Sequence, residues 1–229
     1  MPKSGFGAYL FDLDGTLIDS IDLIFRAYRH TAERHLSISP PDSVWREGLG
    51  TPLRQQLSAV CDDPDLIEVM VATYREYHFA HHEESVKAYP NVVDVIAALS
   101  GRGARLGVVT SKLRSGAERG LVTAGLMEFF HTIVSADEVS RAKPHPEPVF
   151  AALERLGVYA GDAVFIGDSP HDIAAGRQAG VTTAGVLWGP FAREELTLAS
   201  ADFLLESPAE ILSLRPAGRF PPPNVVLDL

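Results

Sequence analysis

Two pairs of aspartates, each placed directly after a short apolar run, are the first candidates for chemistry in this chain. Asp12 and Asp14 follow one run, and Asp168 and Asp172 follow another. In an extended chain, residues i and i+2 point the same way, so Asp12 and Asp14 should face one side. Carboxylates held that close repel one another unless a cation or a proton lies between them. Four carboxylates at one place predict a hard cation with oxygen ligands, for which Mg²⁺ is the usual choice.

Each aspartate, taken alone, also has a simpler explanation. The pair Asp14-Gly15 is typical of a turn, and Asp14 could cap a helix. Asp168 could be the N-cap of the next helix with Asp172 in its first turn, where both acids are favourable. These explanations do not say why two strands of one parallel sheet both end in a carboxylate pair. Ligands of open α/β sheets bind at the carboxyl ends of the strands, which favours a site there.

Two further segments bring groups that suit an anion. Thr110 follows an apolar run, and its hydroxyl and the backbone amides beyond it, at Ser111, could hold an oxyanion. The alternative is a plain helix N-cap. Lys143 lies just before another expected helix, where the alternative is a solvated surface lysine. Pro144 restricts the backbone before it and could fix the direction of the Lys143 side chain.

Composition excludes several classes of protein. The chain has 229 residues, with 20 Lys and Arg against 30 Asp and Glu, so its formal net charge is −10. This balance argues against a nucleic-acid partner and against an anionic membrane surface. The single cysteine, Cys61, cannot form an intrachain disulfide, and no apolar signal segment follows Met1. We expect a soluble, cytoplasmic protein, a monomer or a homodimer.

The apolar runs are short and lie between stretches of helical spacing, which predicts a parallel sheet with helices on both faces. The expected strands are residues 8–11, 106–109, 132–134, 163–166, 183–187 and, with a weaker signal, 202–205. Expected helices cover residues 92–99, 150–156 and 173–178. The predicted fold class is therefore α/β, with a Rossmann-like parallel-sheet core.

A helical block interrupts this pattern after the first strand. The stretch from about Leu17 to Val86 contains no convincing strand, and helices are expected over 21–36, 52–60 and 64–82. Such an insertion can form a small domain above the carboxyl edge of the sheet. We predict an α/β core of residues 1–17 and 86–229, with an extended tail from about residue 215 to 229, and a helical cap of residues 18–85.

Together these motifs resemble the haloacid dehalogenase-like hydrolase superfamily over almost the whole chain. Residues 12–16, with the sequence DLDGT, match its first motif, Thr110 its second and Lys143 its third. Gly167-Asp168 together with Asp172 matches the fourth. The helical insertion looks like the small cap of this family. Any one of these motifs is weak, but four of them in order at strand ends are highly specific.

The resemblance implies a mechanism. Asp12 would attack phosphorus and form an aspartyl-phosphate, and Asp14 would protonate the leaving oxygen and later take a proton from water. Mg²⁺ would be held by Asp12, by the backbone carbonyl of Asp14 and by Asp168. Because a dehalogenase needs neither Mg²⁺ nor an acid at this position, Asp14 favours phosphoryl chemistry.

The other motif residues would support this reaction. Asp12, Thr110, Ser111 and Lys143 would bind the phosphoryl group, with Lys143 balancing the charge on nucleophile and phosphate. Asp172 would orient Lys143 or a metal-bound water.

The cap decides the substrate. Its Gly-rich loop at residues 47–53 is expected to enter the site, and Arg46, Gly50, Thr51 and Arg54 are candidate substrate contacts. Several stretches, among them residues 143–148 and 185–189, resemble the branch of phosphoglycolate phosphatases and bacterial pyrophosphatases. The resemblance implies a small phosphorylated metabolite as the substrate. It favours phosphoglycolate, with pyrophosphate second. A β-phosphoglucomutase-like mutase and a phosphate-binding regulator without turnover are the alternatives.

Three histidines stand outside these motifs. His78 and His82 are four residues apart and would share a helix face, which is the spacing of a zinc pair. The alternative is a polar helix face near the junction of cap and core, with His81 beside it. We favour the polar face because no fixed third ligand accompanies the pair.

Overall fold

The computed structural model describes residues 5–38 and 40–216 of the chain. Its larger lobe contains a six-stranded sheet in the order β5-β4-β1-β6-β7-β8, with every neighbouring pair parallel. The strands are β1 (Ala8–Phe11), β4 (Arg105–Val109), β5 (Thr132–Val134), β6 (Ala163–Gly167), β7 (Thr182–Val186) and β8 (Phe203–Leu205). All six expected strands are present within a residue at either end, and the α/β class is confirmed.

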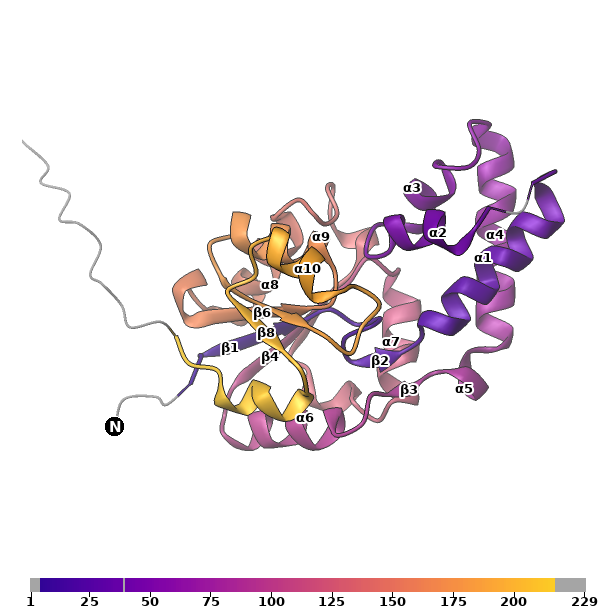
Figure 1. Ribbon diagram of the computed structural model, residues 1–229. Coiled ribbons are helices and arrows are strands. Elements are labelled where there is room, and N and C mark those ends of the chain that lie inside the picture. The colour runs from indigo at the N-terminus through magenta and orange to yellow at the C-terminus, as the bar shows by residue number, and fades with distance from the viewer. Residues whose placement is uncertain (1–4, 39, 217–229) are drawn as a thin grey trace, which may run out of the picture.

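Successive side chains of β1 point to opposite faces of the sheet, and helices cover each face (Figure 1). Tyr9 and Phe11 pack in a cluster with residues of α6 (Val92–Gly101) and α7 (Arg114–Thr123). Ala8 and Leu10 point the other way, into a cluster with residues of α8 (Glu147–Leu156) and α9 (Pro170–Gln178). A strand buried on both faces has no polar positions, which is why β1 is apolar throughout.

The insertion after β1 forms the cap lobe, which we define as the five helices between β2 and β3. They are α1 (Ile21–His35), α2 (Asp42–Gly48), α3 (Leu53–Leu57), α4 (Pro64–Ala80) and α5 (His82–Ser85). Figure 1 shows α1 to α4 gathered beside the sheet rather than over one of its faces. The expected helices are confirmed, whereas the exact division of the chain at residues 17/18 and 85/86 stays a prediction.

One expectation for this region is wrong. The chain enters and leaves the cap lobe through a short antiparallel pair, β2 (Ile18–Asp19) with β3 (Lys87–Ala88). The sequence stretch from 17 to 86 therefore does contain a strand. Two residues are too few to show an alternating pattern, so the signal was absent.

The cap lobe has its own aromatic centre. The rings of Tyr28 and Trp45 stack with centroids 4.7 Å apart and planes at 2°, and Tyr74 lies 4.8 Å from Tyr28. This cluster continues to Ile173 and to Leu196 of α10 (Arg193–Leu198), so apolar side chains join the cap lobe to the sheet lobe.

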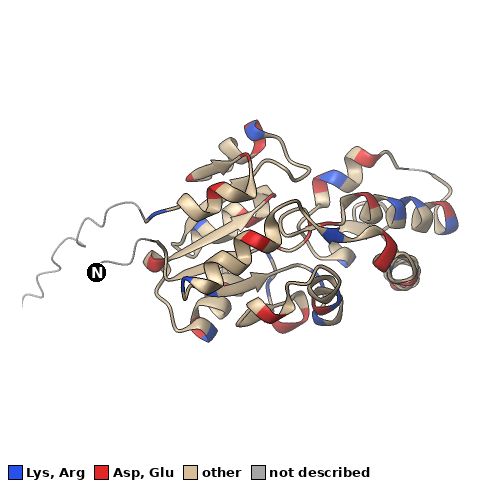
Figure 2. Cartoon of the chain, turned by 90° about the horizontal axis from the view of Figure 1, so that it is seen from below, with Lys and Arg blue, Asp and Glu red and all other residues tan. Residues whose placement is uncertain are grey.

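None of the described helices is both long and apolar enough to cross a membrane. Acidic and basic residues are interspersed over both lobes (Figure 2). The described part of the chain also contains four short 3₁₀ turns, at Met127–Phe129, Ala136–Glu138, Ala160–Asp162 and Pro208–Ser213. Most of the predicted tail, residues 217–229, lies outside the described residues.

We predict that Trp45→Ala lowers the free energy of unfolding by about 3–5 kcal/mol, because it empties the centre of the cap cluster. Trp45 is only 1% exposed. Urea unfolding followed by far-ultraviolet circular dichroism measures the loss. Val69→Ala is the control, because Val69 lies on α4 but is 51% exposed and should cost less than about 0.5 kcal/mol. Equal losses in the two variants would contradict this view of the cap.

Candidate active site

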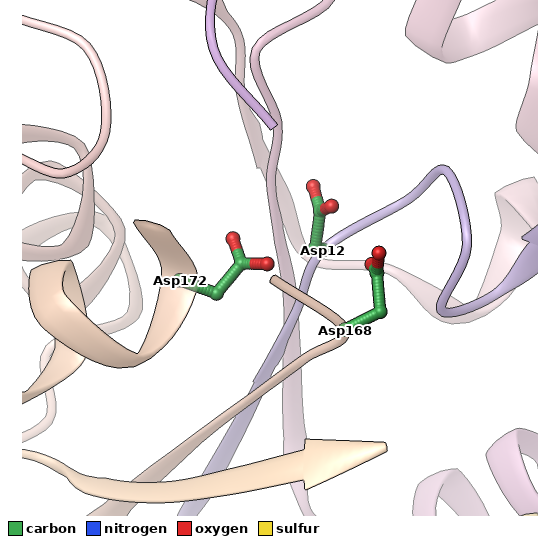
Figure 3. Close-up of side chains that lie close together, drawn as sticks. All are labelled: Asp12, Asp168 and Asp172. Atoms are coloured by element: carbon green, nitrogen blue, oxygen red, sulfur yellow. The ribbon is translucent and has the colours of Figure 1, made fainter. Parts of the chain in front are cut away.

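Three buried carboxylates meet at the carboxyl edge of the sheet. Asp12 follows β1, Asp168 follows β6, and Asp172 lies in the first turn of α9. One oxygen of each lies within 4.8 Å of the others, and Figure 3 shows Asp12 and Asp168 side by side with Asp172 extending toward Asp12 from its helix. β1 and β6 are hydrogen-bonded neighbours, and the ladder continues past β1 where the Asp12 amide donates to the Ile166 carbonyl at 2.9 Å. The pairing of the two strands therefore brings the aspartates together.

Lys143 supplies the positive charge of this cluster. Its Nζ donates to Asp172 Oδ1 at 2.6 Å, to Asp12 Oδ1 at 2.8 Å and to the Val109 carbonyl at 3.2 Å. The residue is only 2% exposed, so the alternative of a solvated surface lysine is wrong. A lysine this deep needs ionic partners, and it has two.

The pKa directions show that one lysine does not balance three carboxylates. Burial raises the pKa of Asp12, and Asp172 adds to this effect, although Lys143 opposes it. Burial and the charges of Asp12 and Asp172 raise the pKa of Asp168 well above its usual value. Burial alone would lower the pKa of Lys143, but Asp12 and Asp172 outweigh it and raise that pKa. The cluster is therefore short of positive charge.

The turn after Asp14 shapes the site around Asp168. Thr16 Oγ1 donates to Asp168 Oδ1 at 2.8 Å. Gly15 has φ +79°, and a Cβ there would lie 2.7 Å from Asp168 Oδ2. Glycine is required at this position both for the left-handed backbone and for space. Gly15 and Thr16 therefore position the carboxylate of Asp168, which follows β6.

The two carboxylate oxygens of Asp172 have different hydrogen-bond partners. Its Oδ2 accepts from the Ser169 amide at 3.1 Å and from the Ser169 hydroxyl at 2.6 Å, which closes a capping box at the start of α9. Its Oδ1 is left for Lys143. The interpretation of Asp168 as the N-cap is wrong, because Ser169 takes that position and leaves Asp168 to face the site.

Asp14 does not join the acidic cluster through its side chain. Its Oδ1 accepts from Lys112 Nζ at 2.6 Å and from Ser20 Oγ at 2.5 Å. Burial would raise the pKa of Asp14, but Lys112 and Ser20 outweigh it and lower that pKa. The expectation of four converging carboxylates is therefore corrected to three, with the fourth paired to a lysine beside them.

Thr110 and Ser111 lie at the end of β4, one strand away from Asp12. Thr110 is 4% exposed, and its hydroxyl accepts from the Lys112 amide at 3.2 Å. Ser111 Oγ instead donates to the Gly50 carbonyl at 2.6 Å, which links this loop to the cap lobe. The Ser111 hydroxyl is therefore already hydrogen-bonded within the protein.

A cavity of about 680 Å³ opens from these residues toward the cap lobe. Among its lining residues are Gly50, Thr51 and Arg54, and Arg54 also pairs with Glu68. Arg46 is not among the described residues that line it. Its guanidinium instead bonds to the Pro190 carbonyl and to Glu195 in the sheet lobe. The structure thus separates the two candidate arginines, and only Arg54 is placed to meet a ligand.

The histidine pair lies near the junction of cap and core, as the favoured interpretation expects, but it is buried at this cavity rather than exposed. His78 and His82 both line the cavity and are 9% and 2% exposed. His81 is not among its lining residues, and its Nδ1 lies 2.8 Å from the Tyr77 carbonyl oxygen. Within the described part of the chain, no third ligand completes a metal group with the pair.

Lys112 and Arg119 line the cavity although neither was predicted as a site residue. Lys112 could have been recognised, because it lies two residues after Thr110 at a strand end. Arg119 lies in α7, a helix that was not predicted from the sequence. Nothing in the local pattern of Tyr28 distinguishes a cavity wall from the centre of the cap, and this residue serves as both.

Known proteins resemble this chain over most of its length. A family model described as haloacid dehalogenase-like hydrolase matches residues 9–186. Pyrophosphatase PpaX of Anoxybacillus flavithermus is 40% identical over 209 residues, which are 90% of this chain and 94% of that protein.

Solved structures share the whole architecture. A predicted phosphatase from Clostridium acetobutylicum has a TM-score of 0.80 at 26% identity, covering 92% of this chain and 100% of that one. A predicted phosphoglycolate phosphatase from Haemophilus somnus has a TM-score of 0.84 at 23% identity, over 91% and 97% of the two chains, and shows the common fold. With the family model covering most of its length and a relative at 40% identity, the chain belongs to the haloacid dehalogenase-like hydrolase family.

Proposed function

We propose that this protein is a metal-dependent phosphatase that hydrolyses a small anionic phosphate, with pyrophosphate as the favoured substrate. The observation that carries the proposal is the buried Lys143, placed between Asp12 and Asp172 with Asp168 beside them. A carboxylate can act as a nucleophile toward an anionic phosphoryl group only where positive charge compensates both. The site concentrates that compensation at Asp12.

In the first step an oxygen of Asp12 attacks phosphorus as the bond from phosphorus to the leaving oxygen breaks. The products are an acyl phosphate on Asp12 and the leaving group, which takes a proton from Asp14 when it needs one. Lys143 stays on Asp12 Oδ1 at 2.8 Å, which directs the other oxygen, Oδ2, to the substrate. The hydroxyl of Thr110, at the end of the adjacent strand, holds a phosphoryl oxygen.

In the second step water attacks the same phosphorus atom. Asp14 takes one proton of the water, the bond between phosphorus and Asp12 breaks, and inorganic phosphate leaves with the Asp12 carboxylate restored. Contacts with Lys112 and Ser20 lower the pKa of Asp14 and so favour the ionised form that this step requires.

The donor set fits a divalent cation. Asp12 and Asp168 are buried carboxylates, and their raised pKa values indicate that too little positive charge surrounds them. Asp12 and Asp168 would hold the ion together with the backbone carbonyl of Asp14, and Mg²⁺ suits such oxygen ligands. When bound, it would reduce the repulsion between the Asp12 carboxylate and the phosphoryl oxygens.

Two observations support pyrophosphate over phosphoglycolate. The relative at 40% identity is named a pyrophosphatase. In addition, Lys112 lies 2.6 Å from Asp14 and favours its ionised form, which withholds the proton that an alkoxide leaving group needs. A phosphate ion is a much weaker base than an alkoxide, so pyrophosphate is cleaved with less acid assistance.

We predict that Asp12→Asn abolishes phosphate release, with a loss of about 10³-fold or more, because the nucleophile is gone. EDTA should remove the activity of the unchanged protein, and Mg²⁺ should restore it. The thermal midpoint of the variant should not fall, since the substitution removes a buried charge whose pKa burial has already raised. Phosphate release that survives both the substitution and EDTA would refute the mechanism.

We expect Asp172→Asn to lower kcat about 10–100-fold with a smaller change in KM, because Lys143 loses one of its two ionic partners. Initial rates over a range of substrate concentrations separate the two constants. Asp202→Asn is the matched control, since Asp202 also accepts hydrogen bonds, from the amide and hydroxyl of Thr183 on β7, which β6 separates from β1. If both variants lose the same fraction of kcat, the effect is general and not due to Lys143.

A phosphate-release assay over pyrophosphate, phosphoglycolate, sugar phosphates and nucleotides, with and without Mg²⁺, tests the choice of substrate. We expect the highest kcat/KM for pyrophosphate. A higher value for phosphoglycolate would identify a phosphoglycolate phosphatase instead. Conversion of a sugar 1-phosphate to the 6-phosphate with little phosphate release would identify a mutase, and tight phosphate binding without any turnover would identify a regulator.

A further inference from the structure

We propose that His78, His82, Arg119 and Lys112 form a second anion-binding subsite, which receives an anionic group carried by the leaving part of the substrate. The inference rests on the proposed phosphatase function and adds to it the residues that select the leaving group. The chemistry of the ligand is a phosphoryl or carboxylate oxygen anion, as in the second phosphate of pyrophosphate or the carboxylate of phosphoglycolate.

The four residues come from separate elements and meet at one cavity. His78 lies on α4, His82 opens α5, Arg119 lies on α7, and Lys112 follows β4. All four line the 680 Å³ cavity that also contains Asp12 and Asp14. The two imidazole rings lie 5.6 Å apart at an angle of 53°. Lys112 contacts Asp14 directly, which places the group on the side of the proposed acid, where a leaving group departs.

Polar atoms of three of these side chains are buried without a hydrogen-bond partner among the described residues. They are His78 Nε2, His82 Nδ1, His82 Nε2 and Arg119 Nη1. Leaving a buried polar atom unpaired costs about 1–3 kcal/mol. Several such atoms around one cavity indicate that their partner is a ligand, because native proteins seldom leave buried polar groups unpaired.

Arg119 is held in place with one amino group left over. Its Nε and Nη2 donate to Glu83 at 2.9 and 2.5 Å, and its guanidinium lies 3.5 Å from the centroid of the Phe79 ring. This leaves Nη1 as the unpaired donor. The guanidinium is thus fixed before a ligand arrives, which reduces the entropy lost on binding.

Charge favours an anion over a metal ion at this place. Burial lowers the pKa of His78 to about 3, and Lys112 lowers it further than Asp14 raises it. Burial, Lys112 and Arg119 likewise lower the pKa of His82. A lowered pKa favours the neutral form of both rings, in which each can donate one N–H group. The carboxylates nearest the rings are already paired, Asp14 with Lys112 and Glu83 with Arg119, and among the described residues no group of metal-binding side chains includes the two rings. The spacing of His78 and His82 that resembles a zinc pair serves anion binding instead.

The test compares substrates with and without an anionic leaving group. In the unchanged protein, kcat/KM is measured for pyrophosphate, phosphoglycolate and p-nitrophenyl phosphate, whose leaving group carries no second anionic group. His78→Phe and His82→Phe keep a ring but remove the donors. We expect the ratio of kcat/KM for the preferred anionic substrate to that for p-nitrophenyl phosphate to fall about 10–100-fold in both variants. The substrate whose ratio falls more, pyrophosphate or phosphoglycolate, identifies the anionic group.

Two further variants control the result. His82→Gln keeps an amide donor and should retain more of the ratio than His82→Phe. His81→Phe alters the neighbouring histidine, which is not among the residues lining the cavity, and should leave the ratio unchanged. An unchanged ratio in both His78→Phe and His82→Phe, or an equal fall in His81→Phe, would overturn the subsite. Hydrolysis of p-nitrophenyl phosphate without hydrolysis of either anionic substrate would also overturn it. Failure of the unchanged protein to hydrolyse any of the three compounds would instead overturn the proposed phosphatase function.

Binding without turnover gives an independent measurement. Asp12→Asn protein is titrated calorimetrically with pyrophosphate in the presence of Mg²⁺, with and without the additional change His82→Phe. We expect the dissociation constant to rise about tenfold or more when His82 is replaced. Equal dissociation constants in proteins with matching circular dichroism spectra would count against the subsite.

Discussion

The cost of burying carboxylates at the edge of a sheet governs the rest of this structure. Asp12, Asp168 and Asp172 are each at most 5% exposed, and charges removed from water at such a place need compensation from close neighbours. Each carboxylate has a specific partner: Lys143 for Asp12, Thr16 for Asp168, and Ser169 with Lys143 for Asp172. The sheet order explains how these partners meet, since β1 lies between β4 and β6 and brings its own end close to both. The fold and the site therefore depend on each other, because moving any of these strands would leave a buried charge without its partner.

An acidic protein that acts on anionic compounds must place its few positive charges locally. The net charge is −10, yet the cavity gathers Lys112 and Arg119, with Arg54 at its cap side, above the buried Lys143. Lys143 pairs with Asp12 and Asp172, whereas Lys112 pairs with Asp14 at the wall of the cavity. Positive charge thus lies in two zones. Under the proposed function, one zone would meet the phosphoryl group under attack and the other would meet the group that leaves, which suits a substrate charged at both ends.

The sequence predicts the position of a functional residue well where that residue directly follows a clear strand pattern. Asp12, Thr110 and Asp168 stand directly after apolar strands, so the topology of a parallel sheet brings them together without knowledge of any side-chain contact. Residues whose role depends on packing between distant segments escaped prediction. Arg46 and Arg54 flank the same loop, and only the docking of the cap lobe shows that Arg46 meets Glu195. His78 and His82 have helical spacing whether they face solvent or a cavity, so their burial follows from α7 and the sheet lobe. The direction of the Asp14 side chain depends on Lys112, about a hundred residues further along the chain.

The loop around Gly50 has one more consequence. Gly50 has φ +90°, a Cβ there would lie 2.8 Å from Ser169 Oγ, and the Gly50 carbonyl accepts from Ser111 Oγ. Backbone atoms of the cap thus rest directly on the residue that caps α9 and on the residue after Thr110, with no side chain between them. Any side chain at position 50 would collide with Ser169, so the close seating of the cap on the sheet lobe at this point depends on the absence of a side chain in the cap loop.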